Sequence, residues 1–254
     1  MSKGSSYLGI IDWGIGGISV NKLIKSRLGQ IPVLYFSDTG ATPYGKLSRS
    51  ELVSRLNKLA SFLGSQGVTH LVLGCNAAST ALPFLSLNGM RVEGVINSAI
   101  RVTRKMRPER LALIGGKRTV LSGVYRRAFA LHGIELEQRV AQPLSALIEN
   151  GDVSSSQLRD ECRRILAPIK NCSHLLLACT HYPAIVPVLK EFVSKDTVLI
   201  DPAAELVNQI AKWELPVGNA DVFLTSGDPE KMKRAAWNAF GVKIRSAKAL
   251  TPDL

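Results

Sequence analysis

The chain has 254 residues, of which 46% are hydrophobic and 20% charged, and 32 Lys and Arg against 20 Asp and Glu give a net charge of +12. This composition excludes a disordered chain and suffices for one large or two smaller domains with a buried core. No apolar run reaches the roughly 18 residues of a membrane span, and the start lacks the apolar stretch of a secretion signal. We therefore expect a cytoplasmic protein that does not bind membranes.

Strands and helices are predicted in alternation along the chain. The first part predicts strands at YLGIIDW, PVLYFSD and THLVLGC, separated by helices at SVNKLIKSRL and SELVSRLNKLASFLGSQG. After VEGVIN, the second part predicts a strand at RLALIGG, helices at VLSGVYRRAFALHG and SSQLRDECRRILAPI, a strand at SHLLLAC, a helix near AIVPVLKEFV and a strand at TVLID. The C-terminal part predicts a strand at VFLTS and a helix at DPEKMKRAAWNAFG, packed on the first lobe. Such alternation is typical of parallel sheets covered by helices on both faces.

The second half of the chain repeats the first. HLVLGCN at 70–76 matches HLLLACT at 174–180, and each of these strands ends in a cysteine. We therefore predict an α/β fold of two pseudo-symmetric lobes, each a mostly parallel sheet flanked by helices, with the active site in the cleft between them. The first lobe is expected to contain residues 1–97 and 208–254, and the second residues 98–207.

Four polar or reactive residues stand at predicted strand ends, namely Asp12, Asp38, Cys75 and Cys179. Ligands of open α/β sheets bind beyond the carboxyl ends of the strands, so both lobes should contribute to one site. A thiol where a strand meets a helix lies in the positive field of the helix terminus, which favours the thiolate. Two thiols that face each other suit the removal of an α-proton from one face of an amino acid and its return on the other.

Three further residues are candidates for assisting these thiols. Asp12 is placed to serve one cysteine, while His181, two residues after Cys179, and Glu149 are placed to serve the other. The remaining cysteines, Cys162 in a predicted helix and Cys172 before a strand, are interpreted as small core or surface residues without a role in the site.

Seven segments carry a family resemblance, namely IIDWGIGG, YFSDTGATPYG, LVLGCNAAS, TVLSGVY, LIENGD, LLLACTHYP and LTSGDPE. On these segments the chain resembles the cofactor-independent aspartate and glutamate racemase family, most closely its glutamate racemases. The resemblance implies two α/β lobes and catalysis by Cys75 and Cys179 without pyridoxal phosphate, another cofactor or a metal. It also implies D-glutamate production for peptidoglycan, and hence a role in cell wall biogenesis and cell shape.

The resemblance also assigns roles to individual positions. The catalytic set that it implies is Cys75, Cys179, Asp12, His181 and Glu149. The substrate-binding set is Asp12, Trp13, Tyr44, Gly45, Asn76, Ala77, Thr180 and His181.

Two of these positions depart from the family pattern. Glutamate racemases usually have DSG where this chain has DWG with Trp13, and CNT where it has CNA with Ala77. Loss of two hydroxyl donors around a charged ligand costs about 1.5 to 3 kcal/mol each when nothing replaces them. Together they indicate a remodelled pocket and leave aspartate or another amino acid open as the substrate. Alternatively, Trp13 packs against the neighbouring lobe and leaves substrate choice unchanged.

Other interpretations remain open from the sequence. Residues 101–127 contain nine Lys or Arg against one Glu, which suits a solvated face, an anion-attracting field or, less well without interleaved aromatics, nucleic acid. A racemase fold retained as a binding or regulatory module is a second alternative. A zinc site at the cysteines and a dinucleotide site at DWGIGG both lack the usual spacing. The expected partner is a small-molecule substrate, an acidic amino acid, and the sequence leaves a homodimer open.

Overall fold

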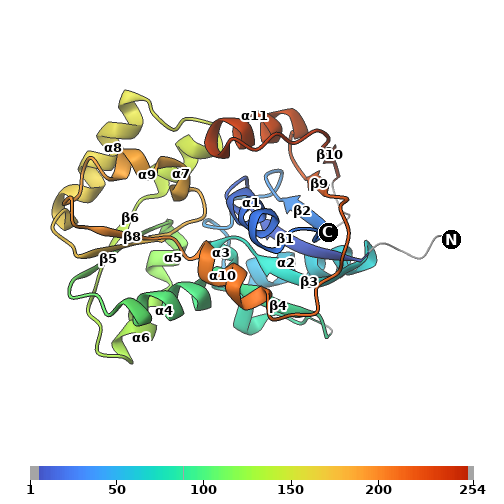
Figure 1. Ribbon diagram of the computed structural model, residues 1–254, viewed down its shortest axis with the longest axis horizontal. Helices are drawn as coiled ribbons and strands as arrows, with labels where there is room; N and C mark the ends of the chain where they lie inside the picture. Colours follow the sequence, from blue (N-terminus) through green and yellow to red (C-terminus); the bar gives the residue numbers. More distant parts are fainter. Residues whose placement is uncertain (1–5, 88, 251–254) are drawn as a thin grey trace.

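The computed structural model describes residues 6–87 and 89–250, which form two lobes lying side by side (Figure 1). Each lobe contains one parallel sheet. The first sheet has the order β10-β9-β2-β1-β3-β4, and its strands are β1 (Tyr7–Asp12), β2 (Val33–Ser37), β3 (Val68–Leu73), β4 (Arg91–Gly94), β9 (Val222–Thr225) and β10 (Lys248–Ala249). The second has the order β6-β5-β7-β8, and its strands are β5 (Leu111–Gly115), β6 (Leu136–Val140), β7 (His174–Ala178) and β8 (Val198–Ile200).

Helices and short helical turns connect the strands. Those that follow β1 to β4 are α1 (Gly17–Leu28), α2 (Arg49–Ser65), α3 (Asn76–Ser79), the 3-10 turn η1 (Leu82–Phe84) and α4 (Val95–Met106). Those of the second half are α5 (Lys117–Leu121), α6 (Val124–Ala130), α7 (Gln142–Glu149), α8 (Ser156–Leu166), η2 (Ala167–Ile169), η3 (Tyr182–Ile185), α9 (Val186–Leu189), α10 (Ala203–Ile210) and α11 (Pro229–Phe240).

The internal repeat predicted from the sequence is present in the sheet topology. The strands β2-β1-β3-β4 of the first sheet and β6-β5-β7-β8 of the second are wound in the same order. In this correspondence β3 matches β7, so the two strands that end in a cysteine occupy equivalent positions. The predicted two-lobed α/β fold is therefore confirmed, and the first sheet differs by the added strands β9 and β10.

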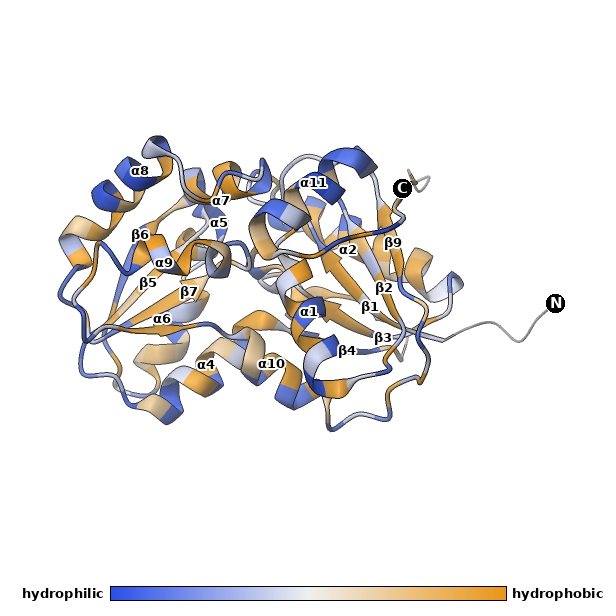
Figure 2. Ribbon diagram, turned by 45° about the horizontal axis from the view of Figure 1, so that its top comes forward, coloured by the Kyte–Doolittle hydropathy of each residue, from blue (hydrophilic) through white to orange (hydrophobic). Residues whose placement is uncertain are grey.

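Apolar side chains on both faces of each strand explain why the sheets lie between helices. In β1, Ile10 packs on the side of α1 and α10, whereas Ile11 packs on the side of α2, because neighbouring side chains of a strand point to opposite faces. The central strands are largely hydrophobic, and many of the hydrophilic residues lie on the helices that cover them (Figure 2). This pattern is typical of parallel sheets.

Two sequence predictions need correction. The single helix expected at 120–133 is two helices, α5 and α6, because Gly123 adopts a positive φ of 67° between them. The helix expected near 184–193 is a 3-10 turn followed by the single turn α9, with Pro183 and Pro187 inside it. Strand β6 was not predicted, since its sequence LEQRV is largely polar and lies at the sheet edge.

The C-terminal part joins the first sheet, as predicted, through pairing of β9 with β2. Helix α11 contacts both lobes, touching α1 and β9 on one side and α7 and η3 on the other (Figure 1). On the opposite side α10 packs on α4 and α1. The lobe boundaries at 97/98 and 207/208 stay a prediction.

A helix that crosses a membrane must be both long and apolar. Among the residues that the structure describes, no helix combines the length and apolar character needed to cross a bilayer.

Candidate active site

The site residues predicted from the two lobes meet at the carboxyl ends of the sheets. Asp12 ends β1, Cys75 follows β3, and Cys179 follows β7. Parallel strands bring these ends to one edge of each sheet, and the two edges face each other. The two thiols are close enough that negative charge on Cys179 contributes to raising the pKa of Cys75.

Asp12 joins the lobes through its carboxylate. Its Oδ2 accepts hydrogen bonds from the backbone N–H of Gly17 at 2.5 Å, at the start of α1, and from Thr180 Oγ1 of the second lobe at 3.1 Å. Asp12 is buried, and burial raises its pKa, with nearby Glu149 adding to the rise and His181 opposing it. A carboxyl group with a raised pKa takes up a proton more readily, which is the behaviour required of a base beside Cys75.

Cys179, His181 and Glu149 form a connected chain in the second lobe. The Cys179 sulfur lies 3.6 Å from Nδ1 of His181, and Nε2 of His181 lies 2.7 Å from Oε2 of Glu149. The same Glu149 oxygen accepts the backbone N–H of Ile15 from the first lobe at 2.9 Å. Glu149 therefore orients the imidazole and fixes its position relative to both lobes.

The environment of His181 favours its protonated form. Burial alone lowers the pKa of His181, but Cys179 and Glu149 on its two sides together raise it well above its usual value. Because Nε2 faces a carboxylate, it carries a hydrogen, and Nδ1 is left to exchange a proton with the sulfur. The pair is thus able to hold the proton that Cys179 gives up and to return it.

Cys75 has a different environment from the one expected. Its burial and the negative charge of Asp12 raise the pKa of Cys75 well above the usual value, although the backbone N–H groups of Ala78 and Trp13 act in the opposite direction. The α3 amide of Ala78 thus favours the thiolate, in the direction expected of a helix start, but the net shift of the Cys75 pKa is upward. Helix α3 spans only Asn76–Ser79, so its field is too weak to offset burial.

Two glycines allow the lobes to approach this closely. A Cβ at Gly14 would collide with the carboxylate of Glu149, and one at Gly16 would collide with Thr180 Oγ1. The glycine-rich turn after β1 thus serves close packing around the site. Close packing of the lobes therefore accounts for the glycines of DWGIGG, and a bound dinucleotide is not needed to explain them.

Tyr125 belongs to the site but had no role in the sequence prediction. Its hydroxyl donates to Oδ1 of Asn76 at 2.7 Å, which orients the amide. The Nδ2 group of Asn76 is buried and has no partner among the described residues. A buried donor without a partner is costly, and a ligand oxygen would satisfy it. The only sequence signal was the position of Tyr125 at the end of TVLSGVY.

The two divergent residues lie beside Cys75. Trp13 and Ala77 pack on the same apolar cluster of the first lobe as Cys75, and the indole N–H of Trp13 donates to the carbonyl of Ala41 at 3.1 Å. Trp13 therefore packs within its own lobe, and the alternative of packing on the neighbouring lobe is not what the structure shows.

Tyr44 and Gly45 lie in the turn after β2. The Tyr44 side chain is buried and bonded to Asp38, and Gly45 faces Gln142 of the second lobe, whose Oε1 would lie 3.6 Å from a Cβ at this glycine. The turn therefore sits between the lobes with the other predicted site residues.

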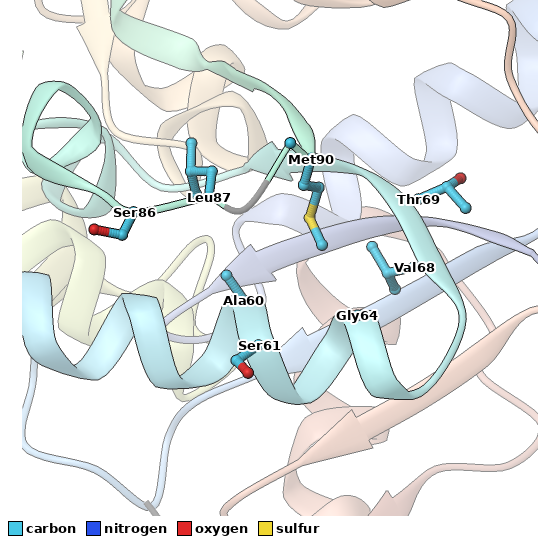
Figure 3. Close-up of a pocket in the computed structure, with 9 residues that line it drawn as sticks. Ala60, Ser61, Gly64, Val68, Thr69, Ser86, Leu87 and Met90 are labelled. Atoms are coloured by element: carbon cyan, nitrogen blue, oxygen red, sulfur yellow. The ribbon is translucent and has the colours of Figure 1, made fainter.

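A surface pocket of about 400 Å³ lies elsewhere, between α2, the amino end of β3 and the residues Ser86, Leu87, Gly89 and Met90 (Figure 3). Its walls include Ala60, Gly64 and Met90, and none of the predicted site residues. Because it lies at the opposite end of β3 from Cys75, we assign it no part in the chemistry.

The remaining candidate residues have structural surroundings. Cys162 and Cys172 are buried in an apolar cluster of the second lobe, as expected. Among the described residues, no group of three or more His, Cys, Asp and Glu side chains is arranged to hold a metal ion.

The fold and site thus define a two-lobed α/β protein with one cysteine from each lobe at a shared site. The family model for Asp/Glu/Hydantoin racemase matches residues 26–210. The glutamate racemase of Gloeobacter violaceus is 32% identical over 241 residues, covering 91% of each chain, and one from Pseudomonas aeruginosa is 33% identical over 251 residues, covering 92% of this chain and 94% of its own.

Solved structures agree with this match. The glutamate racemase from Thermus thermophilus in complex with β-chloro-D-alanine aligns with a TM-score of 0.84 and 27% identity over 98% of each chain. A glutamate racemase isoform from Bacillus anthracis has the same fold, with a TM-score of 0.87 and 24% identity over 97% of this chain and 98% of its own. The chain belongs to the Asp/Glu/hydantoin racemase family. It is therefore an isomerase of the amino-acid racemase class, and its substrate is an amino acid, a small molecule.

We predict that Glu149→Gln lowers the pKa of His181, because it removes one of the two groups that raise it while burial remains. A raised folded-state pKa means that protonation of His181 stabilises the fold at pH below its usual value of 6.5, and this contribution is lost as pH rises through the raised value. Imidazole chemical shifts, followed by NMR against pH in wild type and variant, measure the change. An unchanged His181 titration would show that Glu149 does not govern the imidazole.

Proposed function

We propose that this protein interconverts L- and D-glutamate by a two-base mechanism in which Cys75 and Cys179 act on opposite faces of the α-carbon. The observation that carries the proposal is the placement of the two thiols at the ends of equivalent strands, each beside its own proton-accepting group. Asp12 serves Cys75, and the pair His181 and Glu149 serves Cys179.

The proposed reaction balances in protons and electrons. One sulfur, as thiolate, removes the α-proton, and the electron pair of the C–H bond remains on the substrate as a carbanion. The other sulfur, as thiol, donates its proton to the opposite face, and its S–H electron pair remains on sulfur. The product has inverted configuration, and the two cysteines have exchanged protonation states. Return to the starting state moves protons through Asp12 and His181.

The proposed substrate contacts follow from the polar groups around the two cysteines. We propose that Asn76 Nδ2 and the turn with Tyr44 and Gly45 hold carboxylate oxygens, and that Asp12 and Thr180 hold the ammonium. In support, Asn76 is oriented by Tyr125 and offers a buried donor without a protein partner. Trp13, Ala77 and His181 complete the lining of the proposed substrate site.

Glutamate is proposed because the two relatives described above, which match over most of the chain, are glutamate racemases. With glutamate as substrate, the product D-glutamate would serve peptidoglycan synthesis. A cytoplasmic location goes with this proposal, since the reacting cysteines must stay reduced and all four cysteines are free. The homodimer stays a prediction.

The first test is α-proton exchange in heavy water, followed by NMR with a panel of L- and D-amino acids. Wild type is expected to exchange and invert glutamate. Cys75→Ser and Cys179→Ser are each expected to lose inversion by a factor of about 100 to 10,000, because a serine hydroxyl is a poor base at neutral pH.

Cys172→Ser is the matched control, since Cys172 lies in the second lobe outside the site, and it is expected to keep activity. Exchange and inversion confined to aspartate or another amino acid would correct the substrate. A folded, reduced protein that exchanges no amino acid would favour the binding or regulatory alternative.

Racemisation of an amino acid other than glutamate is a second candidate, favoured by Trp13 and Ala77 beside Cys75. We predict that the double variant Trp13→Ser, Ala77→Thr lowers the KM for glutamate by about tenfold, because it restores hydroxyl donors to a charged ligand. Trp13→Phe is the control, because it also removes the indole N–H that donates to the carbonyl of Ala41 but adds no hydroxyl, and it is expected not to lower the KM. Steady-state kinetics on L- and D-glutamate measure the effect, and an unchanged or higher KM would show that Trp13 and Ala77 already suit the substrate.

A further inference from the structure

Asp38 is a buried carboxylate that the two-base mechanism does not use. It directly follows β2 and accepts four hydrogen bonds from side chains of three other segments. Its Oδ2 accepts from Tyr44 Oη at 2.9 Å and Arg55 Nε at 2.9 Å, and its Oδ1 accepts from Arg55 Nη2 at 2.7 Å and Ser226 Oγ at 2.9 Å. Asp38 is therefore held by α2, by the segment after β9 and by the turn that contains Tyr44.

Arg55 makes the burial of Asp38 tolerable. A buried carboxylate without a partner is strongly unfavourable, whereas a bidentate guanidinium compensates its charge and fixes its orientation. Arg55 lies on α2, whose start is fixed by a capping box between Ser48 and Glu51. The pair thus gives the turn after β2 a rigid anchor.

The Tyr44 phenol is committed to this anchor. Tyr44 is 1% exposed, and its single hydroxyl hydrogen is donated to Asp38. The ring packs in the first-lobe core with Leu52, Leu56 and Phe36. Tyr44 can therefore contribute to substrate binding only through the backbone of the turn, and its side chain determines where that backbone lies.

Three further hydrogen bonds hold the same turn. The N–H of Gly40 donates to Ser226 Oγ at 2.9 Å, and the Trp13 indole donates to the carbonyl of Ala41 at 3.1 Å. From the second lobe, Arg118 Nη1 donates to the carbonyl of Leu47 at 2.5 Å. Residues 39–47 are therefore fixed from both lobes, with Asp38 as the acceptor at their centre.

We propose that Asp38, together with Arg55, is a positioning residue of the racemase site that preorganises the Tyr44–Gly45 backbone for the substrate carboxylate. This inference rests on the proposed function. It assigns substrate affinity, and not proton transfer, to the Asp38 cluster, because the Asp38 carboxylate bonds to Tyr44, Arg55 and Ser226. Only the backbone N–H of Asp38, which the variants leave in place, bonds to Asp12. Preorganisation lowers the conformational cost of binding, so disturbing the anchor should raise KM with little change in kcat.

The test compares Tyr44→Phe and Asp38→Asn with wild type. Both are expected to raise the KM for glutamate by about tenfold while kcat changes by less than about threefold, the effect of losing one or two hydrogen bonds. Hydrogen–deuterium exchange measured by mass spectrometry is expected to speed up at residues 39–47. Tyr44→Phe keeps the buried ring and is expected to fold. It therefore tests the inference even if Asp38→Asn does not fold.

Asp221→Asn is the matched control. Asp221 also pairs with a cation, Lys25, and accepts the N–H of Val33, but it lies at the amino end of β2, away from the turn. It is expected to lower thermal stability without changing KM or exchange at 39–47.

Two results would overturn the inference. The first is an unchanged KM in Tyr44→Phe and Asp38→Asn with a loss of thermal stability alone, while wild type racemises glutamate. The second is unchanged exchange at residues 39–47, which is decisive even where wild type proves inactive on glutamate. Inactive wild type by itself counts against the proposed function and not against the anchor.

Discussion

The packing of two buried carboxylates between the lobes is the constraint on which the site depends. Asp12 and Glu149 are each held partly by their own lobe and partly by the other, through Thr180 and through the N–H of Ile15. Buried carboxylates are tolerated only with such partners, so the lobes are fixed in the relative position that satisfies both. Glycines at 14 and 16 are required at this contact because a side chain there would push the lobes apart.

The two pseudo-symmetric sheets place their cysteines in chemically different surroundings. The equivalent strands β3 and β7 each supply a cysteine, but Cys75 lies beside a carboxylate and Cys179 beside an imidazole. Burial and Asp12 raise the pKa of Cys75 and so favour its thiol form, whereas His181 is able to store the proton of Cys179. Such an arrangement supplies one proton donor and one proton acceptor at once, which inversion of an α-carbon requires.

Local sequence patterns were sufficient where local physics decides the structure. Continuous apolar runs predicted the central strands, and the repeated cysteine after β3 and β7 predicted the two-lobed fold. Strand β6 was missed because an edge strand buries little and LEQRV carries no apolar run. The break between α5 and α6 was not predicted, because a glycine within a helical apolar pattern does not by itself show that the helix ends. The positive φ of Gly123 shows that it does.

Long-range partners could not be derived from single residues. Tyr125 orients Asn76 across 49 positions of sequence, and Asp38 meets Ser226 across 188. Nothing in the local sequence of either residue specifies such a partner, since it is the sheet order that brings them together. The direction of the Trp13 side chain is a similar case, because its indole is fixed by the carbonyl of Ala41, 28 residues away.

The most direct measurement of the central claim is a crystal structure of the wild-type protein with D-glutamate bound. The account predicts the sulfurs of Cys75 and Cys179 on opposite faces of the substrate α-carbon, each within about 3.5 Å of it or of its proton. The turn at Tyr44 and Gly45 would be unmoved relative to Asp38. An amino acid bound with both sulfurs on one face, or bound away from the two cysteines, would contradict the two-base mechanism.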